Sequence, residues 1–421
     1  MTSTRSCDQR RSRGHVGIVG CGTAGPALGT FLARDGWRVT LIERAADLRP
    51  IGAGILLQPT GMHVLDRLGL LKGEGQVLAC GEVVRRLRGG TLSGRSVLDL
   101  AYEDLDRPGS PCFGLGVQRG MLQRHLLDAA RGAHVEIRTG IEVAAIDQPA
   151  ASIVDTHGSR HGPFDLIAVC DGARAGIASS MGIVRRSARY PFGALWYIAD
   201  TPDNHPFTGT LSQVYHGTGT MLGFLPSGRL APGEPARVSL FWSLRLRDER
   251  RMRDEGVRSF RDRVVSLDPR AATLLEGLSS MDQVVTAAYH DTVLHAPVAP
   301  GSDPRVVFLG DAAHAMSPQL GQGANLALLD AMTLAESLRQ AESIGQALLR
   351  YARARKNPTR YYHAASRWLT PVFQSDHEWI APLRDRLFGR LGRLPWVRRQ
   401  MLLALAGVKT GIWTADPIPP F

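Results

Sequence analysis

Three glycines near the amino terminus have the spacing of a phosphate-binding turn. Gly20, Gly22 and Gly25 form a GxGxxG pattern between the apolar run HVGIVG (15–20) and a segment whose apolar residues recur at helical spacing. In such a turn the first glycine allows a sharp bend, the second lets the backbone approach a pyrophosphate, and the third lets the helix pack close to the strand. The free N–H groups at the helix start then face the phosphates. The sequence therefore predicts a dinucleotide site.

An acid further along narrows the choice of dinucleotide. Glu43 ends the next apolar run, WRVTLIER, at the distance where a carboxylate accepts hydrogen bonds from a ribose. A carboxylate there would repel a 2′-phosphate, so NAD and FAD remain and NADP is not expected at this site. The neighbouring Arg44 softens this argument and is kept as a cofactor-binding candidate, although it can equally face the adenine or solvent.

A second glycine-rich stretch, GDAAHAMSPQLGQGAN (310–325), favours FAD over NAD. A nicotinamide dehydrogenase needs no such segment far downstream, whereas the ribityl chain and isoalloxazine ring of FAD reach beyond the first loop. Asp311, at the end of the strand-like run RVVFLGD, can accept hydrogen bonds from ribityl hydroxyls or orient waters on the pyrophosphate. Gly321, Gln322 and Gly323 open a helix, whose electropositive start would stabilise a reduced, anionic flavin by up to about 2 kcal/mol.

These motifs together resemble the FAD-dependent class A aromatic monooxygenases, the para-hydroxybenzoate hydroxylase family. The resemblance rests on GCGTAG with Glu43, on the pair Asp171 and Gly172, and on the second glycine-rich stretch, and it covers residues 14 to 370 in motif order. It implies that Asp171 and Gly172 serve both FAD and NAD(P)H, and that Arg119 contacts the FAD phosphate and ribityl region. The family usually follows the Asp-Gly pair with Ser and Arg, whereas this chain has DGARAG, which leaves the role of the arginine open.

The resemblance also implies roles within the second stretch. Gly310, Asp311 and Pro318 match the segment that contacts the flavin, and the family places the substrate near Pro318 and the Gly-Gln-Gly backbone after it. We interpret His314 mainly as a structural hydrogen-bonding residue, and the loop GAGILLQP places Gln58 near the flavin. The expected cofactor-binding residues are Gly20, Gly22, Gly25, Glu43, Arg44, Arg119, Asp171, Gly172, Gly310, Asp311, Gly321, Gln322, Gly323 and Asn325.

The family's reaction is NAD(P)H-dependent oxygen insertion. The chain has no second GxGxxG before a helix, because the glycines of GTGTMLG (217–223) lie among strand residues, so NAD(P)H has no domain of its own. This agrees with the resemblance, which implies that NADH or NADPH docks transiently, reduces FAD and leaves. The resemblance implies that O2 then forms a flavin C4a-hydroperoxide, from which an electron-rich aromatic or polyketide-like molecule takes one oxygen atom. Epoxidation, oxidative decarboxylation or flavin-linked dehydrogenation on the same scaffold remains open, as does flavin binding without turnover.

A base or hydrogen-bond chain that would activate a phenol or enol is not evident from the sequence. Tyr215 and His216 on the predicted strand TLSQVYHG are our catalytic candidates, together with Pro318, and strand alternation puts Gln213 on the same side as Tyr215. Each has a structural alternative, because Tyr215 can pack on the sheet and His216 can face solvent. Aromatic residues of the neighbouring strands can line an apolar pocket or belong to the core: Trp196, Tyr197, Phe224 and Trp242.

The elements that must position these residues follow an α/β pattern. HVGIVG, the helical segment after it and WRVTLIER read as a βαβ unit, and DLIAVCDG and RVVFLGD read as further buried strands of the same parallel sheet. Residues 185–284 instead alternate apolar and polar positions between turns, which is typical of an antiparallel sheet. We therefore predict a discontinuous Rossmann-like FAD-binding domain (14–184 and 285–370), an inserted antiparallel-sheet substrate domain (185–284) and a C-terminal helical segment (371–421).

The composition of the chain limits which binding partners, metal sites and locations we expect. The chain has 421 residues, is 44% hydrophobic and carries a net charge of +11, which arises from arginines interleaved with acids and does not indicate nucleic-acid binding. Its 5 cysteines lack metal-ligand spacing, so we expect no metal site. No apolar run approaches the ~20 residues that span a bilayer. We expect a cytoplasmic monomer or homodimer without stable membrane insertion, a disordered basic tail (1–13), and packing of WVRRQMLLALAGV (396–408) against the body.

Overall fold

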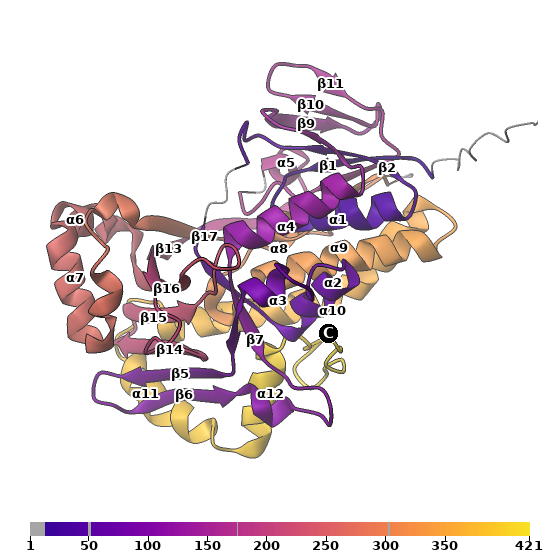
Figure 1. Cartoon of the computed structure of the whole chain (residues 1–421). Coiled ribbons are helices and arrows are strands. Elements are labelled where there is room, and N and C mark those ends of the chain that lie inside the picture. Colours follow the sequence, from indigo (N-terminus) through magenta and orange to yellow (C-terminus); the bar gives the residue numbers. More distant parts are fainter. Residues whose placement is uncertain (1–12, 49–51, 175, 302–303) are drawn as a thin grey trace, which may run out of the picture.

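The computed structural model describes residues 13–48, 52–174, 176–301 and 304–421. The tail predicted to be disordered (1–13) therefore lies outside the described residues except for its last position. Within the described residues the strands form a 5-stranded sheet, a 7-stranded sheet and two 3-stranded sheets, and these are arranged as Figure 1 shows.

The 5-stranded sheet is parallel and carries the βαβ unit that the sequence predicts. Its order is β18-β12-β1-β2-β8, with β1 (His15–Val19), β2 (Arg38–Ile42), β8 (Glu136–Arg138), β12 (Leu166–Val169) and β18 (Val306–Phe308). The strands are buried because both faces are covered: Val16 and Ile18 of β1 pack into one core cluster, while Val19 packs into another on the opposite face. This confirms the α/β fold.

Helices cover one face of this sheet and a small sheet covers the other (Figure 1). The first layer holds α1 (Ala24–Arg34), α4 (Arg119–Gly132) and α9 (Gly323–Gln340), with α1 packed against α4 and α9. The second layer holds β9 (Val143–Asp147), β10 (Ser152–Asp155) and β11 (Arg160–His161), together with α5 (Gly176–Ser180).

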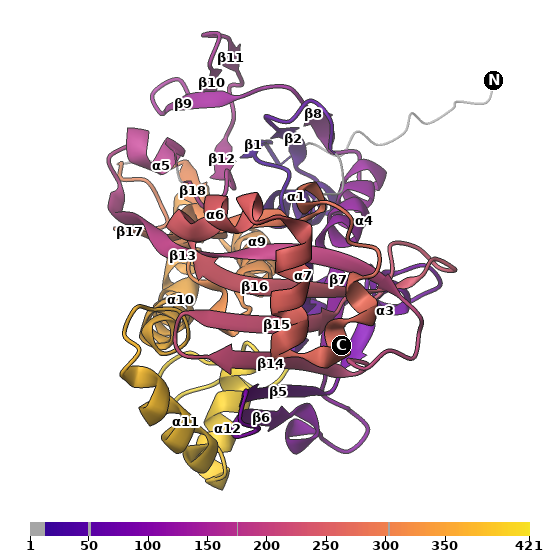
Figure 2. The same ribbon diagram turned by 90° about the vertical axis from the view of Figure 1, so that its left-hand side faces the viewer.

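The 7-stranded sheet has the order β17-β13-β16-β15-β14-β5-β6 and is antiparallel except where β14 runs parallel to β5. Figure 2 shows these strands one below another, with α7 crossing in front. Its strands are β5 (Arg86–Thr91), β6 (Ser96–Ala101), β13 (Val184–Thr201), β14 (Thr210–His216), β15 (Thr220–Pro226), β16 (Ala236–Arg245) and β17 (Val285–Leu294). Three of them, β5, β6 and β17, come from outside residues 185–284. The helices α6 (Glu249–Asp254) and α7 (Gly256–Leu267) cover one face.

The second 3-stranded sheet contains β3 (Gly54–Leu57), β4 (Glu82–Val84) and β7 (Gly114–Gln118), next to α2 (Pro59–Arg67) and α3 (Val77–Cys80). It contacts β15 of the 7-stranded sheet and α9. The apolar residues of GILLQPTGMHVLDRLGL (54–70) have a pattern that resembles a single amphipathic helix. The helix begins only at Pro59, because proline suits the first helical position and Gln58 before it is extended. The residues before Gln58 pair with β7 instead.

The chain ends in helices that cover the second face of the 7-stranded sheet. These are α10 (Ile344–Phe373), α11 (Ile380–Leu391) and α12 (Pro395–Leu405). The short helix α8 (Asp311–His314) follows β18 and packs beside it and β17. Figure 2 shows α11 and α12 beside β5 and β6. Short 3-10 turns complete the fold: η1 (Tyr102–Leu105), η2 (Leu246–Asp248), η3 (Pro269–Ala271), η4 (Thr273–Leu275), η5 (Met281–Gln283) and η6 (Pro318–Leu320). Among the described residues, no helix is long and apolar enough to cross a bilayer.

Candidate active site

Four of the expected cofactor-binding residues lie just beyond the carboxyl ends of neighbouring parallel strands. Gly20 follows β1, Glu43 follows β2, Asp171 follows β12 and Asp311 follows β18. Parallel strands end at the same edge of their sheet, so the fold brings these residues to one side, where ligands of open α/β sheets bind. The Gly20 N–H donates to the Ile42 carbonyl at 2.8 Å, which ties the first turn to the end of β2.

The three glycines of the first turn have different surroundings. Gly20 has φ +104°, and a Cβ there would lie 2.3 Å from the Cys170 carbonyl oxygen. A Cβ on Gly25 would lie 2.0 Å from the Gly20 oxygen, whereas one on Gly22 would meet no atom within 4 Å. The outer glycines thus allow strand, turn and helix to pack closely. Gly22 leaves open space beside the start of α1, which fits the approach of a pyrophosphate.

The Glu43 carboxylate is held by the backbone of both turns beside it. Its Oε2 accepts the Cys21 N–H at 2.8 Å, and its Oε1 accepts the Ala45 N–H at 2.9 Å. Each carboxylate oxygen keeps a second acceptor position, so both can still bind ribose hydroxyls. Burial, and secondarily Glu43, raises the pKa of the Cys21 thiol to about 12, so Cys21 stays neutral beside this acid.

A buried ionic network holds the turn before Asp311. The carboxylate of Asp330, on α9, accepts the Gly310 N–H at 2.8 Å and contacts His314 Nε2 at 2.6 Å, while Arg355 Nε donates to its other oxygen at 2.6 Å. Gly310 has φ +59°, a conformation that favours glycine. These contacts agree with the structural role expected of His314. Asp330 was not among the residues expected from the sequence, although an acid within the apolar helix ALLDAM could have indicated a buried ionic contact.

Asp330 stays ionised inside the protein. Burial by itself raises its pKa, but the charges of His314 and Arg355 and the Gly310 N–H outweigh burial and lower the pKa of Asp330 to about 2. The fixed carboxylate therefore holds the Gly310 turn and the start of α8 in place. The network thus fixes the backbone from which the Asp311 side chain extends.

The carboxylate of Asp171 is only partly hydrogen-bonded. Its Oδ2 accepts the Ile177 N–H at 3.3 Å, while its buried Oδ1 has no hydrogen-bond partner among the described residues. Burial raises the pKa of Asp171. Buried acceptors are nearly always paired, so a hydroxyl or N–H donor of a ligand fits here. The next residue, Gly172, has no neighbour within 4 Å of its added Cβ position, which leaves room for such a group.

The start of α9 lies beside Asp311. The closest atom to a Cβ added at Gly323 would be Asp311 Oδ1, at 3.8 Å, and Gly321 has open space at the same position. The side chain of Gln322 turns the other way, because its Nε2 donates to the Leu405 carbonyl at 2.7 Å. Gln322 can therefore offer a ligand its backbone, while its side chain connects α9 to α12.

Asn325 supports the site through the protein's own backbone. Its Oδ1 accepts the Gln58 N–H at 2.9 Å, and its Nδ2 donates to the carbonyls of Leu56 at 3.2 Å and Gly321 at 3.1 Å. The amide is thus occupied on both sides, and Asn325 positions the loop at Gln58 and the turn at Gly321. The buried Gln58 side chain in turn accepts the Tyr102 hydroxyl at 2.6 Å.

The arginines expected near the cofactor are all exposed. Arg119 begins α4 and lies against Gly52, whose added Cβ would be 3.0 Å from Arg119 Cδ. Arg44 forms an exposed pair with Glu142 at 3.6 Å, so it is turned toward another acid than Glu43. Arg174 is also exposed. Contact of Arg119 and Arg44 with FAD remains a prediction, and the role of Arg174 stays open.

An apolar pocket of about 440 Å³ opens beside the start of α9. Gln319 and Leu320 of η6 form one wall directly before the Gly321 turn, and Gln213 and Tyr215 of β14 form another. The remaining walls come from β5, β6, β15 and the helices α10, α11 and α12, and they are mainly leucine and aromatic side chains. This pocket adjoins the place where the motif residues would hold a flavin ring.

The pocket includes only part of what the sequence suggested. Tyr215 lines it, and its hydroxyl donates to Gln213 Oε1 at 2.6 Å. Burial raises the pKa of Tyr215 far above its ordinary value, although Arg384, 5.0 Å from the ring, opposes this. The raised pKa favours the protonated phenol of Tyr215. His216 and Pro318 are exposed and are absent from the pocket walls.

The pocket's aromatic residues differ from the expected ones. Tyr197, Phe224 and Trp242 belong to the core under α7, and Trp196 packs against Phe241 with ring centroids 5.3 Å apart. Apart from Tyr215, the aromatic side chains that line the pocket come from the C-terminal helices: Tyr361, Trp368, Phe373, Phe388 and Trp396. Helical periodicity predicts that these residues lie on one face of a helix, but it does not tell which distant strand that face covers. The sequence alone therefore did not identify them as pocket residues.

Known proteins are similar to this chain in sequence and in fold. The chain is 29% identical over 345 residues to the probable 2-heptyl-3-hydroxy-4(1H)-quinolone synthase AqdB2 of Rhodococcus erythropolis (80% of this chain, 82% of the relative). It is 27% identical over 334 residues to a 3-hydroxybenzoate 6-hydroxylase of Klebsiella oxytoca (77% and 80%). The structure of Klebsiella pneumoniae HpxO with FAD and uric acid is similar with a TM-score of 0.75 at 20% identity, covering 95% of this chain and 98% of that one.

The tetrameric form of 2-methyl-3-hydroxypyridine-5-carboxylic acid oxygenase has the same fold, with a TM-score of 0.75 at 22% identity over 96% of this chain and 99% of that one. The family model described as FAD binding domain matches residues 13–360, which include the strand-end residues and the α9 start. The chain therefore belongs to the FAD-binding domain family and is an FAD-dependent monooxygenase of the para-hydroxybenzoate hydroxylase type.

Proposed function

We propose that this enzyme uses NADH or NADPH, FAD and O2 to insert one oxygen atom into an aromatic or polyketide-like small molecule that carries an apolar substituent. The observation that carries the proposal is the shared wall between the apolar pocket and the α9 turn: Gln319 and Leu320 line the pocket and immediately precede Gly321. A substrate in this pocket would lie against whatever group the α9 start holds.

The chain's own residues would bind the cofactor and exclude water. Gly22 and the start of α1 would face the pyrophosphate, Glu43 the ribose, and Asp171 and Asp311 further hydroxyl groups. The N–H groups at the α9 start would stabilise negative charge on the ring. When bound, FAD supplies the redox chemistry: it takes a hydride from NADH or NADPH and, with O2, provides the oxygen atom that the substrate gains.

The pocket favours a neutral, largely apolar substrate. Its polar lining groups include the amides of Gln213, Gln319 and Gln400, and among the described residues no charged side chain lines it. A carboxylate buried there would lack a cationic partner, which costs several kcal/mol. Of the two relatives' chemistries, an alkylquinolone therefore fits this pocket better than a hydroxybenzoate.

Turnover of the FAD-loaded protein tests the proposal. We expect a 2-alkyl-4-quinolone to stimulate NADH or NADPH oxidation with matching O2 consumption, and the product to contain one added oxygen atom by mass spectrometry. A product that gains an epoxide, loses CO2 or loses only hydrogen would instead establish epoxidation, oxidative decarboxylation or dehydrogenation. If no aromatic compound stimulates oxidation of either nucleotide, flavin binding without turnover is the better account.

Filling the pocket should block the substrate without disturbing the fold. Ala365 of α10 lines the pocket, whereas its neighbour Ala364 is exposed and does not. We expect Ala365→Trp to raise KM at least about tenfold, because losing the contact of one or two substrate groups costs about 1.4 kcal/mol or more. Ala364→Trp is the matched control and should keep the wild-type KM. Equal kinetics for the two variants would place the substrate elsewhere.

Tyr215→Phe separates hydrogen bonding from proton abstraction. The raised pKa keeps the Tyr215 phenol protonated throughout the range in which enzymes of this kind are assayed. We therefore expect the variant to raise KM by a few fold while the shape of the pH–kcat profile stays unchanged. Loss of an ionisation from that profile would show that Tyr215 is the base after all.

Several predictions made from the sequence still need an experiment. The roles of His216 and Pro318 in catalysis, the domain boundaries, and a monomeric or homodimeric cytoplasmic protein are proposals that follow from the sequence. The His216 side chain is exposed and lies outside the pocket walls, so kinetics of His216→Ala decide its proposed role. A large fall in kcat would support the role, and an unchanged kcat would contradict it.

A further inference from the structure

Large apolar side chains are exposed mainly along the last part of the chain. Trp368 is 83% exposed and Trp413 is 76% exposed. Such exposure is unusual, because tryptophan side chains are highly buried on average in folded proteins. We define the C-terminal apolar face by its exposed members: Trp368, Trp379, Leu383, Leu387, Leu391, Leu394, Trp396, Ile412 and Trp413. Elsewhere in the described chain, only Leu92, Val285 and Leu349 are comparable.

The helix α11 shows why this face is a continuous feature. Leu383, Leu387 and Leu391 recur every four residues and therefore share one side of the helix, and each is more than 40% exposed. The adjoining side, which carries buried Arg384 and half-buried Phe388, packs on the protein. Leu383 and Leu387 therefore form an apolar strip that faces solvent beside the side that packs.

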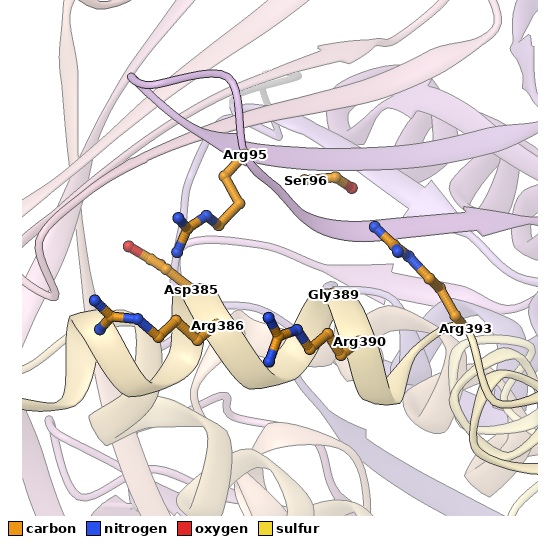
Figure 3. A pocket seen from close by; sticks show the side chains of 7 residues that line it. All are labelled: Arg95, Ser96, Asp385, Arg386, Gly389, Arg390 and Arg393. Atoms are coloured by element: carbon orange, nitrogen blue, oxygen red, sulfur yellow. The ribbon is translucent and has the colours of Figure 1, made fainter.

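Arginines flank the exposed leucines. Arg386, Arg390 and Arg393 extend from α11 and the turn after it, and Arg95 approaches them from the β5–β6 turn (Figure 3). In the described part of the chain none of these guanidinium groups forms an ion pair, because the nearby Asp385 pairs with Arg384 at 2.8 Å. Together they border a groove of about 320 Å³. Uncompensated positive charge therefore lies along the apolar face.

The substrate pocket opens onto the same face. Trp368, Leu391 and Trp396 are all at least 45% exposed, yet they also line the apolar pocket. The rings of Trp396 and Trp413 lie 5.4 Å apart, which extends the face beyond the pocket mouth. An apolar molecule leaving this pocket would therefore meet tryptophan and leucine side chains before it met water.

We propose that the C-terminal apolar face docks on the surface of an anionic lipid bilayer, with α11 in the plane of the interface. Tryptophan and leucine side chains would enter the headgroup boundary while the arginines reach the lipid phosphates, the arrangement of interfacial helices. Charge selects this partner over a second copy of the chain, because the two copies would bring the same unpaired arginines together. Docking would place the pocket mouth where apolar molecules dissolve, and it requires no helix to cross the bilayer.

Vesicle sedimentation of the FAD-loaded full chain tests the proposal and reads binding rather than turnover, so its failure would leave the proposed reaction untouched. We expect binding to phosphatidylglycerol vesicles, much weaker binding to phosphatidylcholine vesicles, and a blue shift of tryptophan fluorescence on binding. Replacing Arg386, Arg390 and Arg393 by Gln should lower the partition coefficient on the order of 100-fold. The control replaces exposed Arg250, Arg251 and Arg258 by Gln and should retain binding.

The apolar contribution needs its own variant pair. Leu383→Gln with Leu387→Gln should lower partition on the order of tenfold, whereas Val285→Gln with Leu349→Gln, which are both 54% exposed in the native chain, should not. Circular dichroism checks that each variant is folded. The proposal is overturned if wild-type protein ignores anionic vesicles, or if only the arginines and not the leucines affect binding. It is also overturned if wild-type protein is a dimer that the leucine substitutions dissociate.

Discussion

Gly25→Ala is expected to lower the affinity for FAD by at least about 100-fold, or about 2.7 kcal/mol. The added Cβ would lie 2.0 Å from the Gly20 carbonyl oxygen, a backbone atom that cannot rotate away. Either α1 moves from β1 or the first turn opens, and both displace the N–H groups that would face the pyrophosphate. Titration of the apo-protein with FAD, followed by flavin fluorescence, measures the effect.

Two further glycine variants separate local packing from cofactor contact. Gly132→Ala, near the end of α4, meets no atom within 4 Å and should bind FAD as the wild type does. Gly22→Ala also meets no atom within 4 Å, so it should keep the wild-type melting temperature. It should nevertheless weaken FAD binding, because the methyl group would occupy the space expected for the pyrophosphate. Wild-type FAD affinity in Gly22→Ala would contradict this placement.

Asp330→Ala should produce the largest loss of stability, about 3–5 kcal/mol. The substitution leaves the buried Arg355 guanidinium without its carboxylate partner and removes the acceptor of the Gly310 N–H. Chemical denaturation measures the loss. Asp128→Ala removes an exposed pair with Arg131 and serves as the control, with an expected change of at most about 1 kcal/mol.

The Asp330 carboxylate also makes the folding stability of the protein depend on pH in the acid range. The folded-state pKa of Asp330 is lowered to about 2, whereas an unfolded Asp titrates near ~3.9. The stabilisation by Asp330 is therefore fully present above the unfolded value and is lost as the pH falls toward 2. We expect the stability gap between wild type and Asp330→Ala to narrow over that window. A gap that stays constant down to pH 2 would contradict the ionised state.

The sequence predicts where the expected cofactor residues lie in the fold, because the signals there are local. GxGxxG, the acid after the next strand and the glycines before α9 each combine a turn with the element beside it. Gly20, Glu43, Asp171 and Asp311 follow parallel strands, so recognising the strands is enough to bring them to one edge. The βαβ pattern and the antiparallel strands between 185 and 284 are visible for the same reason.

The pocket side could not be predicted because it depends on contacts between distant segments. β5, with two glycines in RLRGGT, has a weak strand pattern, and it joins the large sheet by pairing with β14 more than a hundred residues later. The Asp330 and Arg355 pair joins two helices, and periodicity alone does not reveal which buried positions face each other. Phe373 and Trp396 line the pocket only because α10 and α12 fold back over this sheet.

The electron density of FAD in crystals of the loaded protein tests the central claim most directly. The account predicts one FAD whose pyrophosphate lies against Gly22 and the start of α1, whose hydroxyl groups meet Glu43 and Asp311, and whose ring adjoins Gly321 with an edge open to the apolar pocket. A ring bound away from Gly321, or a purified chain that takes up no flavin at all, would contradict it.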